Sequence, residues 1–139
     1  MSDRPAERWK VRVYYEDTDF SGWVYHASYL RFLERGRTEW LRAFGFGHRA
    51  LAGATGVLFA VRSLQIVFLA PALMDDLLQV ETRALKAGGA SLEFRQRIVR
   101  DDRELVTATV LVAAIRDGRA TRIPASLRRA LEQGPPLTG

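Results

Sequence analysis

One long amphipathic segment, followed by four strand-like segments separated by short turns, limits the folds open to this chain. Residues 26–44 place apolar side chains on one face of a helix and charged side chains on the opposite face. The apolar face would consist of Tyr29, Phe32, Leu33, Gly36, Trp40, Ala43 and Phe44. Such a helix, of about 18 residues and roughly 27 Å, must bury this face against another element.

The segments around this helix have the composition of strands. Residues 9–16 alternate apolar and polar side chains, which predicts a strand before the helix. Gly45 and Gly47 predict the end of the helix. The later strand-like segments, rich in β-branched and large apolar residues, are 56–72, 76–85, 90–101 and 104–118, and residues 124–133 predict a short C-terminal helix.

This order predicts an α+β fold in which an antiparallel five-stranded sheet wraps around one long helix. Gly36 costs about 1 kcal/mol of helix propensity on the buried face, so we expect sheet backbone to approach the helix closely there. The sheet has free edges, and its own helix covers only one face. A homo-oligomer is therefore expected.

Composition excludes several classes of protein. All 139 residues fit one domain, and the absence of cysteine excludes disulfides, zinc fingers and thiolate catalysis. The first ten residues lack the pattern of a signal peptide, and no window reaches the ~18 apolar residues of a membrane span, so we expect a cytoplasmic protein. The formal charge of +5 is scattered without a basic run or a nucleic-acid motif, so we expect no nucleic-acid partner.

The polar residues of greatest interest lie in the stretch YYEDTDFSGWVYHASYLRFLERGR, residues 14–37. Its pattern D-x-D-x-x-G-x-V-Y-H-x-x-Y resembles the opening of the hotdog-fold acyl-CoA thioesterases. Among these enzymes, the resemblance is to the branch of the 4-hydroxybenzoyl-CoA thioesterase family that is associated with the Tol-Pal envelope system. The segments APALMDDLLQVET and SLEFRQRIVRDDRELVTATVLVAAI extend the resemblance over about residues 9–130, within a single hotdog domain of residues 1–139.

The resemblance implies a hotdog fold, a homodimer or homotetramer, and hydrolysis of acyl-CoA without a metal or other cofactor. The family's catalytic aspartate corresponds to Asp19, and the backbone N–H of His26 would polarise the thioester carbonyl. Gly22 would let the turn bring backbone close to the substrate, and Tyr25 would line the acyl pocket. Trp23 stands where the branch commonly has a smaller aliphatic residue, which would narrow that pocket.

The chemistry of the residues agrees with these roles. A helix N-terminus offers unpaired N–H donors and partial positive charge to an oxyanion. A carboxylate beside it can act as base for water or attack directly, and the sequence leaves both routes open. Glu16 and Asp17 are interpreted as structural or solvated, and a hard-metal cluster would need a further ligand that the sequence does not supply.

Two other functions remain open for the same fold. An acyl-carrier-protein thioesterase would receive its pantetheine arm from a protein, and an interaction module near the cell envelope would have no turnover. In some family members a basic run before the fourth strand holds the CoA phosphates. Here that segment keeps only Lys86, so Lys86, Arg62 and Arg95 are the candidates for this contact.

Overall fold

The computed structural model describes residues 7–133; residues 1–6 and 134–139 lie outside the described range. Its elements follow one another as β1 (Glu7–Arg12), η1 (a 3₁₀ turn, Tyr15–Asp17), α1 (His26–Ala43), α2 (His48–Thr55), β2 (Leu58–Phe68), β3 (Leu77–Ala87), β4 (Ser91–Arg100), β5 (Arg103–Arg116), β6 (Arg119–Ala120) and α3 (Ala125–Gln133). No helix in residues 7–133 has the length and apolar character to cross a membrane.

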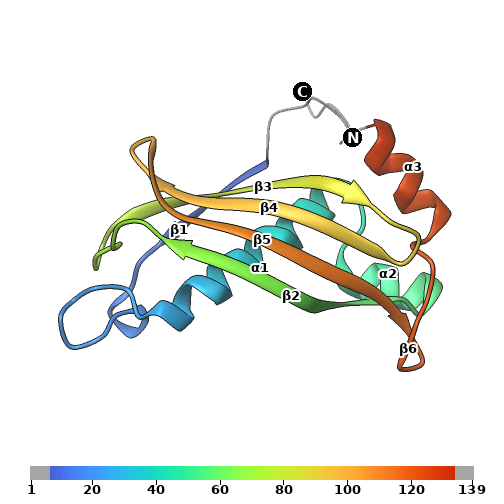
Figure 1. Ribbon diagram of the computed structural model, residues 1–139, viewed down its shortest axis with the longest axis horizontal. Helices are drawn as coiled ribbons and strands as arrows, with labels where there is room; N and C mark the ends of the chain where they lie inside the picture. The colour runs from blue at the N-terminus through green and yellow to red at the C-terminus, as the bar shows by residue number, and fades with distance from the viewer. Residues whose placement is uncertain (1–6, 134–139) are drawn as a thin grey trace.

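The five long strands form one antiparallel sheet, with the two-residue β6 added beside the end of β5. The strand order is β1-β3-β4-β5-β2, so β1 and β2 are the outer strands. Helix α1 lies across one face of this curved sheet, the inner face, while the loop that precedes α1 lies at one end and α2, β6 and α3 at the other (Figure 1). The predicted fold, a sheet wrapped around one long helix, is confirmed.

Helix α1 packs against β3 and β4 through the face predicted from sequence. Tyr29, Phe32, Leu33 and Trp40 are buried there. At Gly36 the approach is so close that an added Cβ would lie 2.6 Å from Val80 Cγ1. The helix is therefore close to the sheet at this glycine, but the prediction that sheet backbone makes the contact was wrong, because side chains of β3 and β4 lie nearest.

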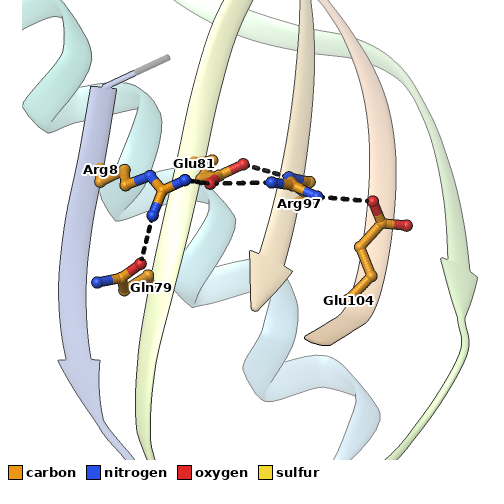
Figure 2. Close-up of polar contacts among 5 residues, drawn as sticks. All are labelled: Arg8, Gln79, Glu81, Arg97 and Glu104. Carbon is orange, nitrogen blue, oxygen red and sulfur yellow. Dashed lines mark hydrogen bonds and ion pairs between the residues drawn. The ribbon is translucent and has the colours of Figure 1, made fainter. Parts of the chain in front are cut away.

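The outer face of the sheet carries an ion-pair network that crosses four strands (Figure 2). Glu81 on β3 is buried, and it accepts bonds from Arg8 of β1 (2.6 Å) and from Arg97 of β4. Arg97 also reaches Glu104 of β5 at 2.9 Å. Pairing with Glu81, and then with Glu104, raises the pKa of the Arg97 guanidinium. The network thus holds together strands whose inner faces contact the helix.

Two local predictions were wrong. The first strand ends at Arg12 and is followed by the η1 turn, because Asp17 accepts a hydrogen bond from the backbone N–H of Tyr14 and bends the chain there. Helix α2 occupies residues 48–55, where no element was expected. It is only eight residues long, between Gly47 and Gly56, and burial of Leu51 in the core stabilises it.

Substitution Gly36→Ala tests the close packing of α1 on the sheet. The added methyl gains up to about 1 kcal/mol of helix propensity, but overpacking against Val80 costs typically 1–3 kcal/mol, so we expect net destabilisation. Gly53→Ala in α2 is the matched control, because nothing lies within 4 Å of its added Cβ and it should stabilise the protein. Denaturant unfolding measures both, and a Gly36→Ala protein as stable as the Gly53→Ala protein would contradict the packing.

Candidate active site

A tight hairpin turn carries Asp19 at the end of the sheet next to the start of α1. Thr18 and Val24 form a bridge, and the Asp19 N–H donates to the Trp23 carbonyl at 2.8 Å. Gly22 has a φ of +83°, a left-handed conformation that glycine adopts without strain. The turn is joined to the chain after β2, since the Val24 N–H donates to the Ala72 carbonyl at 2.9 Å.

The carboxylate of Asp19 is exposed and is hydrogen-bonded within its own turn. Its Oδ1 accepts from the Ser21 hydroxyl and from the Ser21 N–H at 2.8 Å. These bonds, led by the one from the hydroxyl, hold the pKa of Asp19 below its ordinary value of 3.8. Asp19 is therefore ionised throughout the physiological pH range and accessible to a ligand.

Asp17, two residues earlier, has the opposite character because it is buried. Its carboxylate accepts from the Tyr14 N–H (2.9 Å) and from Arg31 Nη2 of α1 (3.1 Å). Its backbone carbonyl accepts from the Tyr25 N–H at 2.8 Å and from the Ser28 hydroxyl at 3.1 Å. Asp17 thus fixes the first turn of α1 beside the turn that carries Asp19, consistent with the structural role expected for it.

Helix α1 begins at His26, as the sequence predicted. Among the described residues, the backbone N–H groups of His26 and Ala27 donate to no protein acceptor. These free donors mark the positive end of the helix. The rings of Tyr25 and His26 lie 4.4 Å apart, and both side chains are exposed. Gly22, Tyr25, His26 and Asp19 thus occur in one short structural unit.

The hydroxyl of Tyr29 secures the next turn of α1. It accepts the Ala72 N–H at 3.0 Å, and burial raises the pKa of this phenol. The Tyr29 ring also lies 5.6 Å from that of Phe68, the last residue of β2. The start of α1 and the end of β2 are therefore at the same end of the sheet.

A cavity of about 200 Å³ lies farther along α1, near the start of β2. Apolar side chains from the helix and three strands line it, together with Glu34, Arg37 and Thr38. Arg37 donates to Gln96 Oε1 at 2.9 Å, and burial lowers the pKa of its guanidinium. Glu34, which lines this cavity, follows His26 by eight positions, or roughly 12 Å of helix. Within one chain, the cavity therefore does not lie beside Asp19.

Ser21 was not predicted from the sequence as the partner of Asp19. The series Asp19, Ser21, Gly22 contained the signal, since aspartate followed by serine and glycine is typical of a turn in which the aspartate binds backbone N–H groups. Trp23, considered for its bulk from the sequence, is exposed, and so is Phe20 in the same turn. Within residues 7–133 no three side chains of the types His, Asp and Glu are grouped to hold a metal ion.

Known proteins share this arrangement of elements. The model of the thioesterase-like superfamily matches residues 13–131. The chain belongs to this superfamily. It is 50% identical over 109 residues to an acyl-CoA thioester hydrolase, YbgC, of Escherichia coli, covering 78% of this chain and 81% of the relative. It is 47% identical over 109 residues to the acyl-CoA thioesterase YbgC of Haemophilus influenzae, covering 78% and 80%.

Solved structures agree with this assignment. The crystal structure of a probable thioesterase from Bartonella henselae superposes with a TM-score of 0.83 at 43% identity, covering 86% of this chain and 99% of that one. The hotdog fold and the resemblance stated from sequence are both confirmed.

Removing the Ser21 hydroxyl tests the electrostatics of Asp19. In Ser21→Ala the carboxylate loses its strongest hydrogen bond, so we expect the pKa of Asp19 to rise toward 3.8. NMR titration of the Asp19 side-chain carbon measures it, with Ser126→Ala, an exposed serine of α3, as control. An unchanged Asp19 titration in Ser21→Ala would show that the hydroxyl does not stabilise the charge.

Proposed function

We propose that the chain hydrolyses acyl-CoA thioesters in the cytoplasm, with Asp19 as general base or nucleophile and the N-terminus of α1 as the carbonyl-polarising group. The observation that carries this proposal is an exposed, ionised carboxylate in the turn that leads into α1, whose first backbone N–H groups are free of protein acceptors among the described residues. The similarity to the acyl-CoA thioester hydrolase YbgC over four fifths of that protein supports the choice of substrate.

Attack on a thioester moves negative charge onto the carbonyl oxygen. In the proposed site the His26 N–H donates to that oxygen, and one such donor is typically worth about 2.7–4 kcal/mol in the barrier. Asp19 either takes a proton from an attacking water, or attacks the carbonyl carbon itself to give a mixed anhydride that water then hydrolyses. Either route breaks the C–S bond and releases CoA as a thiolate that takes up a proton.

The other predicted residues have supporting roles in this proposal. Gly22 lets the turn approach the substrate without a side chain in the way. In this proposal the exposed ring of Tyr25 contacts the acyl group, and the exposed imidazole of His26 orients the water or the carbonyl. Both rings would be partly covered by bound substrate.

Substitution Asp19→Asn is expected to lower thioester hydrolysis at least a hundredfold, because the amide neither accepts the proton of water nor attacks carbon. Since Asp19 is exposed, the fold should be unaffected. A thiol-release assay over short, medium, long and aromatic acyl-CoAs provides the measurement. Glu16→Gln is the matched control, as it removes a neighbouring exposed carboxylate. Near-wild-type turnover by Asp19→Asn on every active substrate would contradict the role proposed for Asp19.

The same assay addresses the two alternatives left by the sequence. A carrier-protein thioesterase would hydrolyse one acyl chain faster from acyl carrier protein than from CoA. An interaction module would release no thiol from any substrate and would form a stable protein complex. The proposal expects turnover on CoA thioesters.

We also propose that two chains associate through β2, as a dimer alone or as half of a tetramer. Within the described residues β2 pairs with β5 on one side only. Its 11 residues carry exposed apolar side chains, including Leu58, Val61 and Val67, with one charge at Arg62. Soluble proteins protect such edges, and antiparallel pairing with a second copy would satisfy its backbone groups.

Charge supports the same pairing. The end of the sheet near Asp19 has four arginines, Arg12, Arg31, Arg100 and Arg103, against the seven carboxylates Glu16, Asp17, Asp19, Asp75, Asp76, Asp101 and Asp102. The other end is basic, since residues 116–129 contain five arginines and one aspartate. Antiparallel pairing of β2 sets the acidic end of each chain beside the basic end of its partner. It also brings each cavity close to the Asp19 of the partner, where it would receive the acyl group.

Substitution Val67→Lys tests this interface, because a lysine on an edge strand opposes pairing with another strand. We expect the wild-type protein to sediment as at least a dimer and the variant to sediment as a monomer. Leu85→Lys on β3 is the control, since Leu85 is similarly exposed but lies away from β2. A Val67→Lys protein that stays dimeric, or a monomeric wild type, would contradict the interface.

A further inference from the structure

We propose that Arg116 and Arg119, on the hairpin between β5 and β6, bind the phosphate groups of the CoA thioester whose carbonyl lies at Asp19 of the partner chain. This inference rests on the proposed function and names the residues that hold the nucleotide end of its substrate. The sequence had suggested Lys86, Arg62 and Arg95 for that contact.

The hairpin places two arginines directly opposite one another. Asp117 and Gly118 form its two-residue turn, both with positive φ (52° and 75°), and Arg116 pairs with Arg119 in the ladder. Side chains at such positions have Cβ atoms about 4.5–5.5 Å apart, and like charges there are destabilising. Within residues 7–133 the structure gives neither arginine an ion pair, although a polyanion bound between them would neutralise both charges.

Both arginines belong to the face of the sheet that carries the proposed thioester site. Along β5 the buried residues Val112 and Ala114 point toward the helices, and alternation gives Arg116 the same direction. The side chain of Arg116 lies over Gly56, where an added Cβ would be 3.7 Å from its Cγ. Arg116 thus covers the junction of α2 and β2, at the start of the free edge strand.

Within one chain these arginines are remote from Asp19. Leu58 pairs with Ile115, so the hairpin lies at the start of β2, whereas the Asp19 turn follows its end. The strand is 11 residues long, which separates the two by roughly 33 Å. Figure 1 shows β6 and the loop that precedes α1 at opposite ends of the molecule. Antiparallel pairing of β2 with a second copy brings the start of one strand beside the end of the other.

The chemistry of the hairpin suits the nucleotide half of CoA. That half carries a diphosphate and a 3′-phosphate, and planar guanidinium groups form paired, charge-assisted bonds with phosphate oxygens. Arg122 and Arg129 are exposed on the same segment and add to its positive potential. The acidic surroundings of Asp19 offer no comparable excess of cations.

A second cross-strand pair of arginines in the chain provides the matched control. Arg83 and Arg95 are also directly opposite, exposed and without an ion pair among the described residues. They lie on the outer face, because Val80, Thr82 and Gln96 of the same strands point toward Gly36. This position on the outer face removes Arg95 from the candidates for the CoA contact in the present inference. Removing this pair changes the net charge equally without touching the inner face.

The first test compares hydrolysis of one acyl group on CoA and on pantetheine, which lacks the nucleotide. In Arg116→Gln/Arg119→Gln the ratio of kcat/KM for acyl-CoA over acyl-pantetheine should fall at least tenfold, mainly through KM. In Arg83→Gln/Arg95→Gln it should change less than twofold. An unchanged ratio in the first variant, or equal falls in both, overturns the inference while leaving the proposed function standing.

The second test determines which chain supplies the arginines. A mixed dimer of one Asp19→Asn chain and one Arg116→Gln/Arg119→Gln chain has one complete site if the arginines act across the interface. It should then show half the wild-type kcat at the wild-type KM. A mixed dimer that shows only the raised KM of Arg116→Gln/Arg119→Gln would mean that the arginines and Asp19 of one site belong to the same chain. That result would overturn the assignment of the arginines to the partner.

Direct binding keeps the inference testable without turnover. Calorimetric titration with CoA should give a Kd at least tenfold weaker for Arg116→Gln/Arg119→Gln than for the wild type. Equal affinities would refute the inference. A wild type that binds CoA through these arginines but hydrolyses no thioester would refute the proposed function alone.

Discussion

The contact between Gly36 of α1 and Val80 of β3 fixes where the helix lies on the sheet. No other residue leaves room for that approach, and buried polar bonds reinforce it. Gln96 donates to the Leu33 carbonyl at 2.9 Å and to the Thr82 hydroxyl at 2.9 Å. A helix held by both close packing and satisfied buried bonds cannot slide without losing several contacts at once. The position of its N-terminus follows from this contact.

Two aspartates, two residues apart in the sequence, have different roles at that N-terminus. Asp17 is buried, and its bonds to Arg31 and to the Tyr14 N–H compensate for the loss of solvent around its charge. Asp19 is exposed and bonded only within its turn, so its carboxylate can meet a ligand without disturbing the helix. The separation explains how one short segment combines a rigid helix start with an accessible carboxylate.

Sequence patterns predicted the elements whose burial repeats with the period of a helix or strand. Helix α1 and the four later strands were placed correctly for that reason, whereas the turn at Gly22 was placed from its residue types. Helix α2 was missed because it is only eight residues long and lies between Gly47 and Gly56, where the glycines predicted an irregular segment. The Asp19 segment was located through its motif, but the Ser21 bond depends on turn geometry. The facing of Arg116 and Arg119 depends on register, which residue spacing alone does not give.

The opposite charges of the two sheet ends bear on how a multiply charged substrate could be bound next to the carboxylate of Asp19, for which we propose a catalytic role. Arginines placed beside Asp19 in the same chain would pair with it, and a paired carboxylate is a weaker base and nucleophile. In the proposed dimer the cations come from the partner and lie farther from Asp19, along the bound CoA. The arginines of the partner then bind the CoA phosphates, while Asp19 acts on the thioester. Recognition of CoA therefore requires the assembled dimer. In this proposal, dissociation through β2 would separate Asp19 from the arginines and the cavity of the partner, while leaving the Asp19 turn folded.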